Sequence, residues 1–320
     1  MIWFRSPKIQ AFIAFSISAI ILSLLLYRID TQRVLSILIE SDLRLVALAV
    51  AISLSVNLGL GALKWRKALL YLGHDLSYKK IFVIRTGCIP FKVIFPLKSN
   101  EVVKALCLQR SEGIPAPRAM SSVILGKSLN LIVTISIFLT GLILAGSPIS
   151  RFIPAAILAI LLLFMLSSRF RHVFLLLPRR VGGKIALFFN QLISPFEEIG
   201  VKGKTLLAFY AAVYQSSEFL NAYILFRAVG IDVPISQILI FVPLMMVVDN
   251  LPVTSLGIGT REALAVLFFS QYGRWASALS VGILLSLVEY LLPAIVGLFF
   301  IRLFTGYFAD PKKSYKEAAV

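Results

Sequence analysis

The chain contains several apolar stretches long enough to cross the hydrocarbon core of a bilayer, which takes about 20 helical residues. Hydrophobic residues make up 59% of the 320 residues, which leaves too little polar surface to coat a soluble globule of this size. We therefore predict an all-α, polytopic membrane helix bundle, with residues 1–320 forming a single integral membrane domain. The clearest stretches are Ile9–Tyr27, Leu45–Leu63, Ser121–Ala145, Phe152–Leu166, Leu206–Val229, Ile235–Val248 and Ala276–Ile301.

The basic residues between these stretches predict the orientation of the chain. Of the 32 Lys and Arg residues, 21 lie in residues 1–8, 64–80, 98–118, 167–204 and 303–320. The segments 28–43, 146–151 and 229–234 contain only Arg28, Arg33 and Arg151. By the positive-inside rule, the first set of segments is cytoplasmic and the second external. We therefore expect a multi-pass protein of the inner or plasma membrane with both termini cytoplasmic, and no nucleic-acid partner despite the net charge of +17.

Two segments cannot be full crossings if this orientation holds. Both termini lie inside, so the number of crossings must be even. The loop assignments require Ile81–Leu97, which contains Arg85 and Pro90, to enter and leave by one face. They also require Ile235–Gly273 to return to the outside. We therefore expect six full spans and two re-entrant hairpins with broken helices.

The two hairpins share a pattern of an apolar segment, a proline–serine break, a charged turn and a helix. Irregular backbone at membrane depth is tolerated only where protein or a water-filled cavity surrounds it, so the breaks predict a polar interior. The breaks lie 156 residues apart and are entered from opposite faces, which is typical of an inverted-topology repeat with halves of about 1–145 and 152–302. The break positions are Pro96, Ser99, Pro252, Ser255, Gly257 and Gly259.

Ionisable residues within or beside the apolar stretches are candidates for binding a substrate. A charge there costs about 2.5–3.5 kcal/mol at mid-helix, so these residues should face the bundle interior. Structural ion pairing among them is the alternative, and for Arg261 this means a pair with Glu262 in a tight turn. We expect the cations to attract a lipid phosphate, and the carboxylates to hold those cations or to bind a positive headgroup or a coupling proton. The candidates are Lys98, Glu101, Lys104, Lys127, Glu218, Asp249, Arg261, Glu262 and Glu289.

The second break carries the most specific motif, a proline and a short spacer followed by Gly257-x-Gly259-x-Arg261-Glu262. With residues 27–30, 63–66 and 95–104, it resembles the lysylphosphatidylglycerol synthetase transmembrane family, also described as flippase-like membrane proteins. The chain differs from many members at Asn100, where a glycine is common. It also has Gly126 and Lys127 where many members carry an acidic–arginine pair.

The resemblance implies that the chain moves a polar lipid, anionic or else aminoacylated or glycosylated, between leaflets. In relatives this region is coupled to an aminoacyl-phospholipid synthetase domain, but only 19 residues follow Ile301 here. We therefore expect the lipid to be made by a separately encoded enzyme, so that the partners are membrane lipids and such an enzyme.

Two other classes of function remain open, an integral membrane lipid-linked transferase and an accessory subunit of a lipid or glycoconjugate pathway. A transferase needs an acid–base or metal site, and the sequence has no aspartate-rich metal motif or histidine cluster. An accessory subunit would tolerate neutralisation of the buried charges. We expect a transporter that is not an enzyme and has no metal or cofactor. It also lacks a P-loop, so its energy would come from an ion gradient or another protein.

The charge distribution makes a testable prediction about topology. Cysteines introduced at positions 74, 175 and 315 should be shielded from an impermeant thiol reagent in intact cells, whereas one at position 148 should react. External labelling at position 175 would overturn the orientation.

Overall fold

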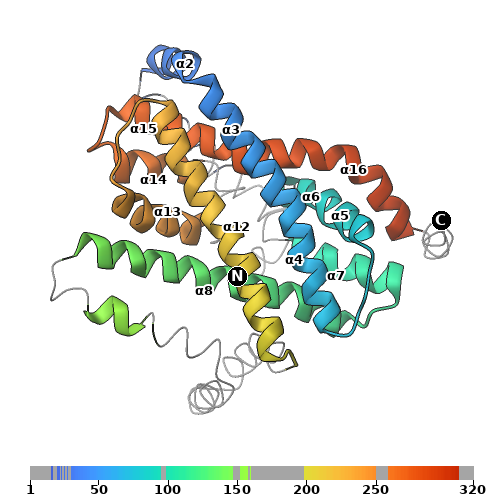
Figure 1. Ribbon diagram of the computed structural model, residues 1–320. Coiled ribbons are helices and arrows are strands. Elements are labelled where there is room, and N and C mark those ends of the chain that lie inside the picture. The colour runs from blue at the N-terminus through green and yellow to red at the C-terminus, as the bar shows by residue number, and fades with distance from the viewer. Residues whose placement is uncertain are drawn as a thin grey trace, which may run out of the picture.

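A computed structural model describes residues 30–94, 99–146, 152–157, 198–249 and 259–309, with isolated positions between 16 and 27 and at 159. These residues form helices joined by short turns, and they contain no β-strand (Figure 1). The predicted all-α class is therefore confirmed. The stretches Ile9–Tyr27 and Phe152–Leu166 lie largely outside the described residues.

Among the described residues, three helices are long and apolar enough to cross a membrane: Leu43–Tyr71, Ala116–Ala145 and Trp275–Tyr307. They contain the predicted stretches Leu45–Leu63, Ser121–Ala145 and Ala276–Ile301 but extend beyond them. In element labels, the first comprises α3 (Leu43–Leu54), η2 (Ser55–Leu60) and α4 (Gly61–Tyr71), and the second is α8 (Ala116–Ala145). The third comprises α15 (Trp275–Ser286), η5 (Leu287–Leu291) and α16 (Leu292–Ala309).

The predicted end of the second stretch at Leu63 is wrong, because the helix continues to Tyr71. Lys64 is therefore part of this long helix rather than of a cytoplasmic loop, and it is only 7% exposed. The start of the helix is fixed by Asp42, whose carboxylate accepts hydrogen bonds from the backbone N–H groups of Arg44 and Leu45. Two further helices are α2 (Thr31–Glu40) and α12 (Val201–Ala228), and α12 contains most of the predicted stretch Leu206–Val229.

Within the described residues, the segments predicted to form hairpins, together with the residues that follow the first break, contain short helices. They are α5 (Tyr78–Gly87), α6 (Ile89–Ile94), α7 (Ser99–Glu112), α13 (Ile235–Asp249) and α14 (Thr260–Phe269). Even the 15-residue α13 is about 22 Å long, shorter than a hydrocarbon core of roughly 30 Å. Ser99 begins α7, and Gly259 precedes α14 with φ +86°. The other break positions, Pro96, Pro252, Ser255 and Gly257, lie outside the described residues, so the re-entrant hairpins and the inverted repeat stay predictions.

The short helices pack reciprocally on the long ones (Figure 1). In the first half, α7 packs on α8 of its own half while α5 lies along α16 of the second half. In the second half, α14 packs on α15 of its own half while α13 lies along α8 of the first half. These contacts join elements from the first and second parts of the chain into one bundle.

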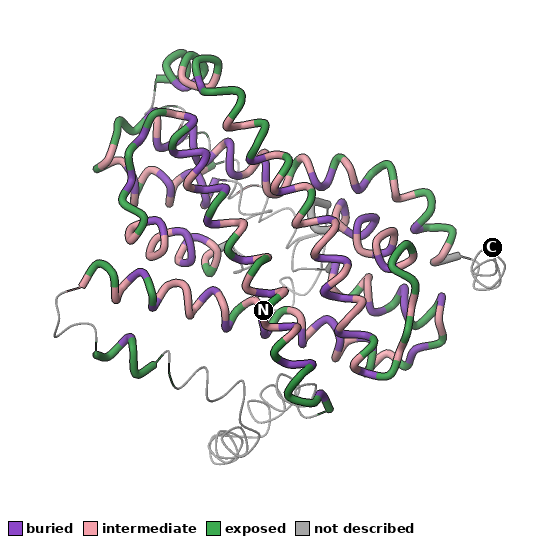
Figure 2. Tube along the Cα trace, viewed as in Figure 1, coloured by how far each residue is buried: buried purple, intermediate pink, exposed green. Residues whose placement is uncertain are grey.

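Glycines allow the close approach of these helices. A Cβ atom at Gly297 of α16 would lie 2.6 Å from the carbonyl oxygen of Thr86 in α5. A Cβ atom at Gly141 of α8 would lie 2.9 Å from the backbone of Leu239 in α13. Small residues that bring two backbones into contact are typical of helix packing in membranes. Figure 2 shows the buried residues gathered where the helices meet and exposed residues on the outer faces. Phe299 of α16 is one of the exposed large apolar residues.

The contact at Gly297 can be tested against Gly306 in the same helix, where an added Cβ atom would meet no atom of the described chain within 4 Å. Gly297→Ala should lower the free energy of unfolding by about 1–3 kcal/mol, because the added methyl group overpacks the contact with Thr86. Gly306→Ala should leave it unchanged or slightly higher, since alanine favours a helix. Thermal unfolding of the two variants in detergent measures the difference, and equal unfolding temperatures would contradict the close contact.

Candidate functional site

Two of the three long helices contain a π-helical turn near their midpoints, η2 in Leu43–Tyr71 and η5 in Trp275–Tyr307. A π-helical turn inserts an extra residue into an α-helix and often marks a functional site. The two turns meet inside the bundle, where the side-chain amide of Asn57 in η2 donates to the backbone carbonyl of Glu289 in η5 at 3.5 Å. Polar groups from distant parts of the sequence are therefore brought together here.

Beside these turns lies a polar cavity of about 150 Å³, which is room for about five water molecules at liquid density. Its described lining comes from η2, η5 and helices α4, α5, α6, α7, α8 and α12. Four cationic and three acidic side chains line it, which gives a formal charge of +1 if all are ionised. These are Lys64, Arg85, Lys104, Lys127, Glu101, Glu218 and Glu289. An excess of positive charge in a low-dielectric setting favours an anionic ligand.

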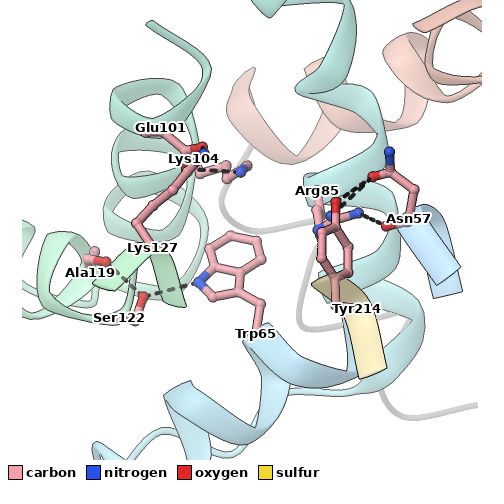
Figure 3. A network of polar contacts seen from close by, with 9 residues as sticks. All are labelled: Asn57, Trp65, Arg85, Glu101, Lys104, Ala119, Ser122, Lys127 and Tyr214. Carbon is pink, nitrogen blue, oxygen red and sulfur yellow. Dashed lines mark hydrogen bonds and ion pairs between the residues drawn. The ribbon is translucent and has the colours of Figure 1, made fainter. Parts of the chain in front are cut away.

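One cluster in the cavity joins α7 to α8 (Figure 3). The two carboxylate oxygens of Glu101 contact different ammonium groups, Lys104 Nζ at 2.9 Å and Lys127 Nζ at 3.0 Å. The side chain of Lys127 is 50% exposed, whereas those of Lys104 and Glu101 are mostly buried. One carboxylate balances only one of the two cations, so the cluster keeps a net positive charge at its more open side.

A second cluster joins α5, η2 and α12 (Figure 3). The guanidinium of Arg85 donates to the backbone carbonyl and, at 3.3 Å, to the side-chain oxygen of Asn57. The hydroxyl of Tyr214 donates to that same side-chain oxygen at 3.2 Å. Gly61 makes room for the guanidinium, because a Cβ atom there would overlap it. Arg85 is therefore held by the irregular backbone of η2.

Aromatic rings face the cations of the cavity. Lys64 Nζ donates to the side-chain oxygen of Asn130 and lies 4.7 Å from the centre of the Tyr214 ring. Lys104 Nζ lies 5.9 Å from the centre of the Trp65 ring, within the range of a cation–π interaction. The indole N–H of Trp65 donates to Ser122 at 3.0 Å, which fixes the ring between α4 and α8 (Figure 3).

The structure brings five of the nine predicted binding residues to this cavity: Glu101, Lys104, Lys127, Glu218 and Glu289. Lys98 lies outside the described residues, and the side chain of Asp249, the last residue of α13, is not described. Sequence reasoning missed Lys64, Arg85, Asn57 and Tyr214. Lys64 was interpreted only as a topology signal and Arg85 only as an interruption of the apolar segment Ile81–Leu97, although a cation inside an apolar helix is itself a signal of an interior site.

Arg261 and Glu262 occupy a neighbouring position behind the cavity wall, and they are 4% and 3% exposed. Glu262 accepts hydrogen bonds from the backbone N–H of Gly259 at 2.7 Å and from the hydroxyl of Ser286 at 2.6 Å, so it caps α14. The guanidinium of Arg261 stacks on the ring of Tyr290, 3.9 Å from its centre. Tyr290 lines the cavity, so in the described part of the chain one aromatic ring stands between Arg261 and the cavity.

The family model described as the lysylphosphatidylglycerol synthase TM region matches residues 11–297. The chain belongs to this family. The match covers every described residue that lines the cavity, from Asn57 to Tyr290. A comparison with curated proteins finds no match. Family membership and the three membrane-length helices together show a membrane protein with a lipid-related function.

The hydrogen bonds on Asn57 predict a thermodynamic coupling. Asn57→Leu should lower the free energy of unfolding by about 1–3 kcal/mol, because it leaves the buried Tyr214 hydroxyl without its acceptor. Tyr214→Phe should cost less, since the oxygen of Asn57 still accepts from Arg85. The double variant should cost less than the sum of the two single variants.

The coupling is measured by unfolding wild type, the two single variants and the double variant with denaturant in detergent, as a double-mutant cycle. Tyr223→Phe is a matched control on α12, because the Tyr223 hydroxyl bonds only an exposed arginine, Arg227, among the hydrogen bonds of the described chain. Strict additivity of the Asn57 and Tyr214 variants would show that the bond contributes nothing.

Proposed function

We propose that the chain is a transporter or flippase that moves a polar lipid between the leaflets of the inner or plasma membrane, and that it is not an enzyme. The observation that carries this proposal is the cavity, whose charged lining lies between membrane-length helices of a lipid-related family. Charged side chains are costly at this depth, so their grouping around one space favours a polar ligand there.

The charges of the cavity favour a lipid with a phosphate in its headgroup. The half-exposed ammonium group of Lys127 is the cation that a headgroup entering beside α7 and α8 would meet first. Lys64, Arg85 and Lys104 line the same cavity. Ammonium and guanidinium groups bind phosphate by charge-assisted hydrogen bonds. The carboxylates of Glu218 and Glu289 offer contacts to a positive group elsewhere in the headgroup.

The size of the cavity limits what enters it. A volume of about 150 Å³ accommodates a polar headgroup but not two acyl chains. The acyl chains would stay in the bilayer, against outer faces that expose large apolar side chains such as Leu298, Phe299 and Leu303 of α16. We propose that membrane lipids are the partners, that both termini are cytoplasmic, and that a separately encoded enzyme supplies the lipid.

Reconstitution into vesicles tests the proposal. The vesicles would contain phosphatidylcholine, phosphatidylglycerol and a trace of headgroup-labelled phosphatidylglycerol, and the rate at which label becomes accessible to a membrane-impermeant quencher would be measured. Lys127→Gln should slow translocation by roughly 10- to 100-fold, the equivalent of one lost hydrogen bond to a charged group. A rate in wild-type vesicles no faster than in protein-free vesicles would contradict transport of this lipid.

Arg118→Gln is the matched control. Arg118 is an exposed cation on the same helix, α8, and is not among the described residues that line the cavity. Its neutralisation should leave the rate within about twofold of wild type, because exposed charges contribute little. Equal slowing by the two variants would mean that bulk surface charge, and not the cavity, controls the rate.

A further inference from the structure

Glu289 occupies an unusual position in the bundle. It lies in the π-helical turn η5, lines the cavity, and is held by neutral groups from two other helices. Its Oε1 atom accepts a hydrogen bond from the side-chain amide of Asn221 in α12. Its Oε2 atom lies 3.1 Å from the hydroxyl of Ser53 in α3.

The hydroxyl of Ser53 lies within hydrogen-bond distance of two oxygens but carries a single proton. Ser53 Oγ is 2.9 Å from the backbone carbonyl oxygen of Val288 and 3.1 Å from Glu289 Oε2. A backbone carbonyl can only accept, so a hydroxyl that donates to Val288 has only lone pairs to offer Glu289. Both contacts are full two-centre hydrogen bonds at once when Glu289 carries a proton on Oε2 and donates it to Ser53 Oγ. When Glu289 is ionised, the Ser53 hydroxyl either shares its proton between the carbonyl oxygen of Val288 and Glu289 Oε2 or donates it to one of them alone.

Asn221 provides a second, independent observation. Its side chain is fully buried, and its Oδ1 atom has no hydrogen-bond partner within the described parts of the chain. Rotating the amide by 180° would therefore break no bond of that oxygen and would turn an acceptor toward Glu289 Oε1. With nitrogen toward Oε1 the amide donates to an oxygen without a proton, which suits both the ionised form and a form protonated on Oε2; with oxygen toward Oε1 it suits only a form protonated on Oε1. A proton on either carboxylate oxygen therefore has a possible acceptor, the Ser53 hydroxyl for Oε2 and the rotated Asn221 amide for Oε1.

We propose that Glu289 is a proton-binding site, and that its proton is the ion coupled to lipid movement. The first part stands on the geometry alone, while the coupling rests on the proposed function. In the binding step a proton from water in the cavity forms an O–H bond with Oε2, and the Ser53 hydroxyl turns from Oε2 to the carbonyl of Val288. Release reverses both movements, and no electrons are transferred.

Other charged and titratable groups surround this site and set the pH at which it responds. Tyr214 and Glu218 of α12, Arg85 of α5 and Lys64 of α4 line the same cavity as Glu289. Arg261 of α14 stacks on Tyr290, the next residue in the chain. A lipid phosphate bound to Lys64 or Arg85 would change the charge around Glu289, which is how ligand and proton would influence each other.

Infrared difference spectroscopy of the purified full chain tests the proton site without any transport. Lowering the pH from mildly alkaline to mildly acidic should produce the carbonyl band of a protonated carboxylic acid in wild type, and Glu289→Gln should lack one carboxyl's share of it. Proton uptake over the same range should fall by one proton per protein in the variant. Glu218→Gln is the matched control, since it removes a carboxylate from the same cavity and should leave the Glu289 band in place. An unchanged band and uptake in Glu289→Gln would overturn the proposal.

A second variant keeps the test decisive if Glu289→Gln does not fold. Ser53→Ala retains the carboxyl group but removes the hydroxyl, which donates to Oε2 when Glu289 is ionised and accepts the proton when it is not. The hydrogen bond to the charged form is the stronger of the two, so the acid band should already appear at higher pH, by up to about one pH unit or a tenfold higher proton affinity. Ser280→Ala should not move the band, because Ser280 is a buried hydroxyl in the same long helix as Glu289 that donates to the carbonyl of Ala276. Equal behaviour of Ser53→Ala and Ser280→Ala would overturn the role of Ser53.

Vesicles separate the proton site from the transport function. With the trace of headgroup-labelled phosphatidylglycerol, an imposed pH gradient should change the wild-type translocation rate, and the ratio of rates with and without the gradient should fall to one in Glu289→Gln. A gradient effect of equal size in wild type and variant would overturn the coupling. If wild type moves no labelled lipid but keeps the Glu289-dependent band, the proton site stands and the proposed function fails.

Discussion

Within a bilayer, polar groups must find their partners inside the protein, and the central part of this structure depends on how one guanidinium meets that requirement. Arg85 donates to both the backbone and the side chain of Asn57, and Gly61 leaves the space that its side chain occupies. Asn57 belongs to η2 and Gly61 directly follows it, so the π-helical turn and the guanidinium of Arg85 stabilise each other. Tyr214 then uses the same acceptor, which ties α12 to the two helices of the first half.

The cavity follows from this irregular backbone rather than from a gap in the packing. A π-helical turn redirects side chains, and η2 and η5 bring Asn57 and Glu289 into contact. Around them the glycine contacts, such as Gly297 against Thr86, hold the short helices tightly against the long ones. The helices therefore pack tightly at their glycine contacts and leave a polar cavity beside the π-helical turns. The reciprocal contacts of α5 with α16 and of α13 with α8 place this space between the two halves of the chain.

The sequence predicts some of this because hydropathy and isolated charges are local signals. Long apolar stretches identified the helices that contain Leu45–Leu63 and Ser121–Ala145, and the charges Lys127, Glu218 and Glu289 stood out in apolar surroundings. Lys64 was missed because a lysine at the end of an apolar stretch looks the same whether it faces water or a cavity. Asn57 and Tyr214 were missed because neutral polar residues are common in helices, and only the fold brings them together. The stacking of Arg261 on Tyr290 depends on tertiary contact, so no spacing along the chain predicts it.

The position of Trp65 has a practical consequence for optical measurements. Its indole ring is nearly buried, its N–H is bound to Ser122, and the ammonium group of Lys104 lies over its face. The chain has three tryptophans, and Trp275, the other one that the structure describes, is exposed at the start of a long helix. Indole emission responds to nearby charge and hydration, so an anion that draws Lys104 away from the ring alters the light that Trp65 emits. The protein thus contains an intrinsic fluorophore in the wall of its own cavity, which reports occupancy without any attached dye.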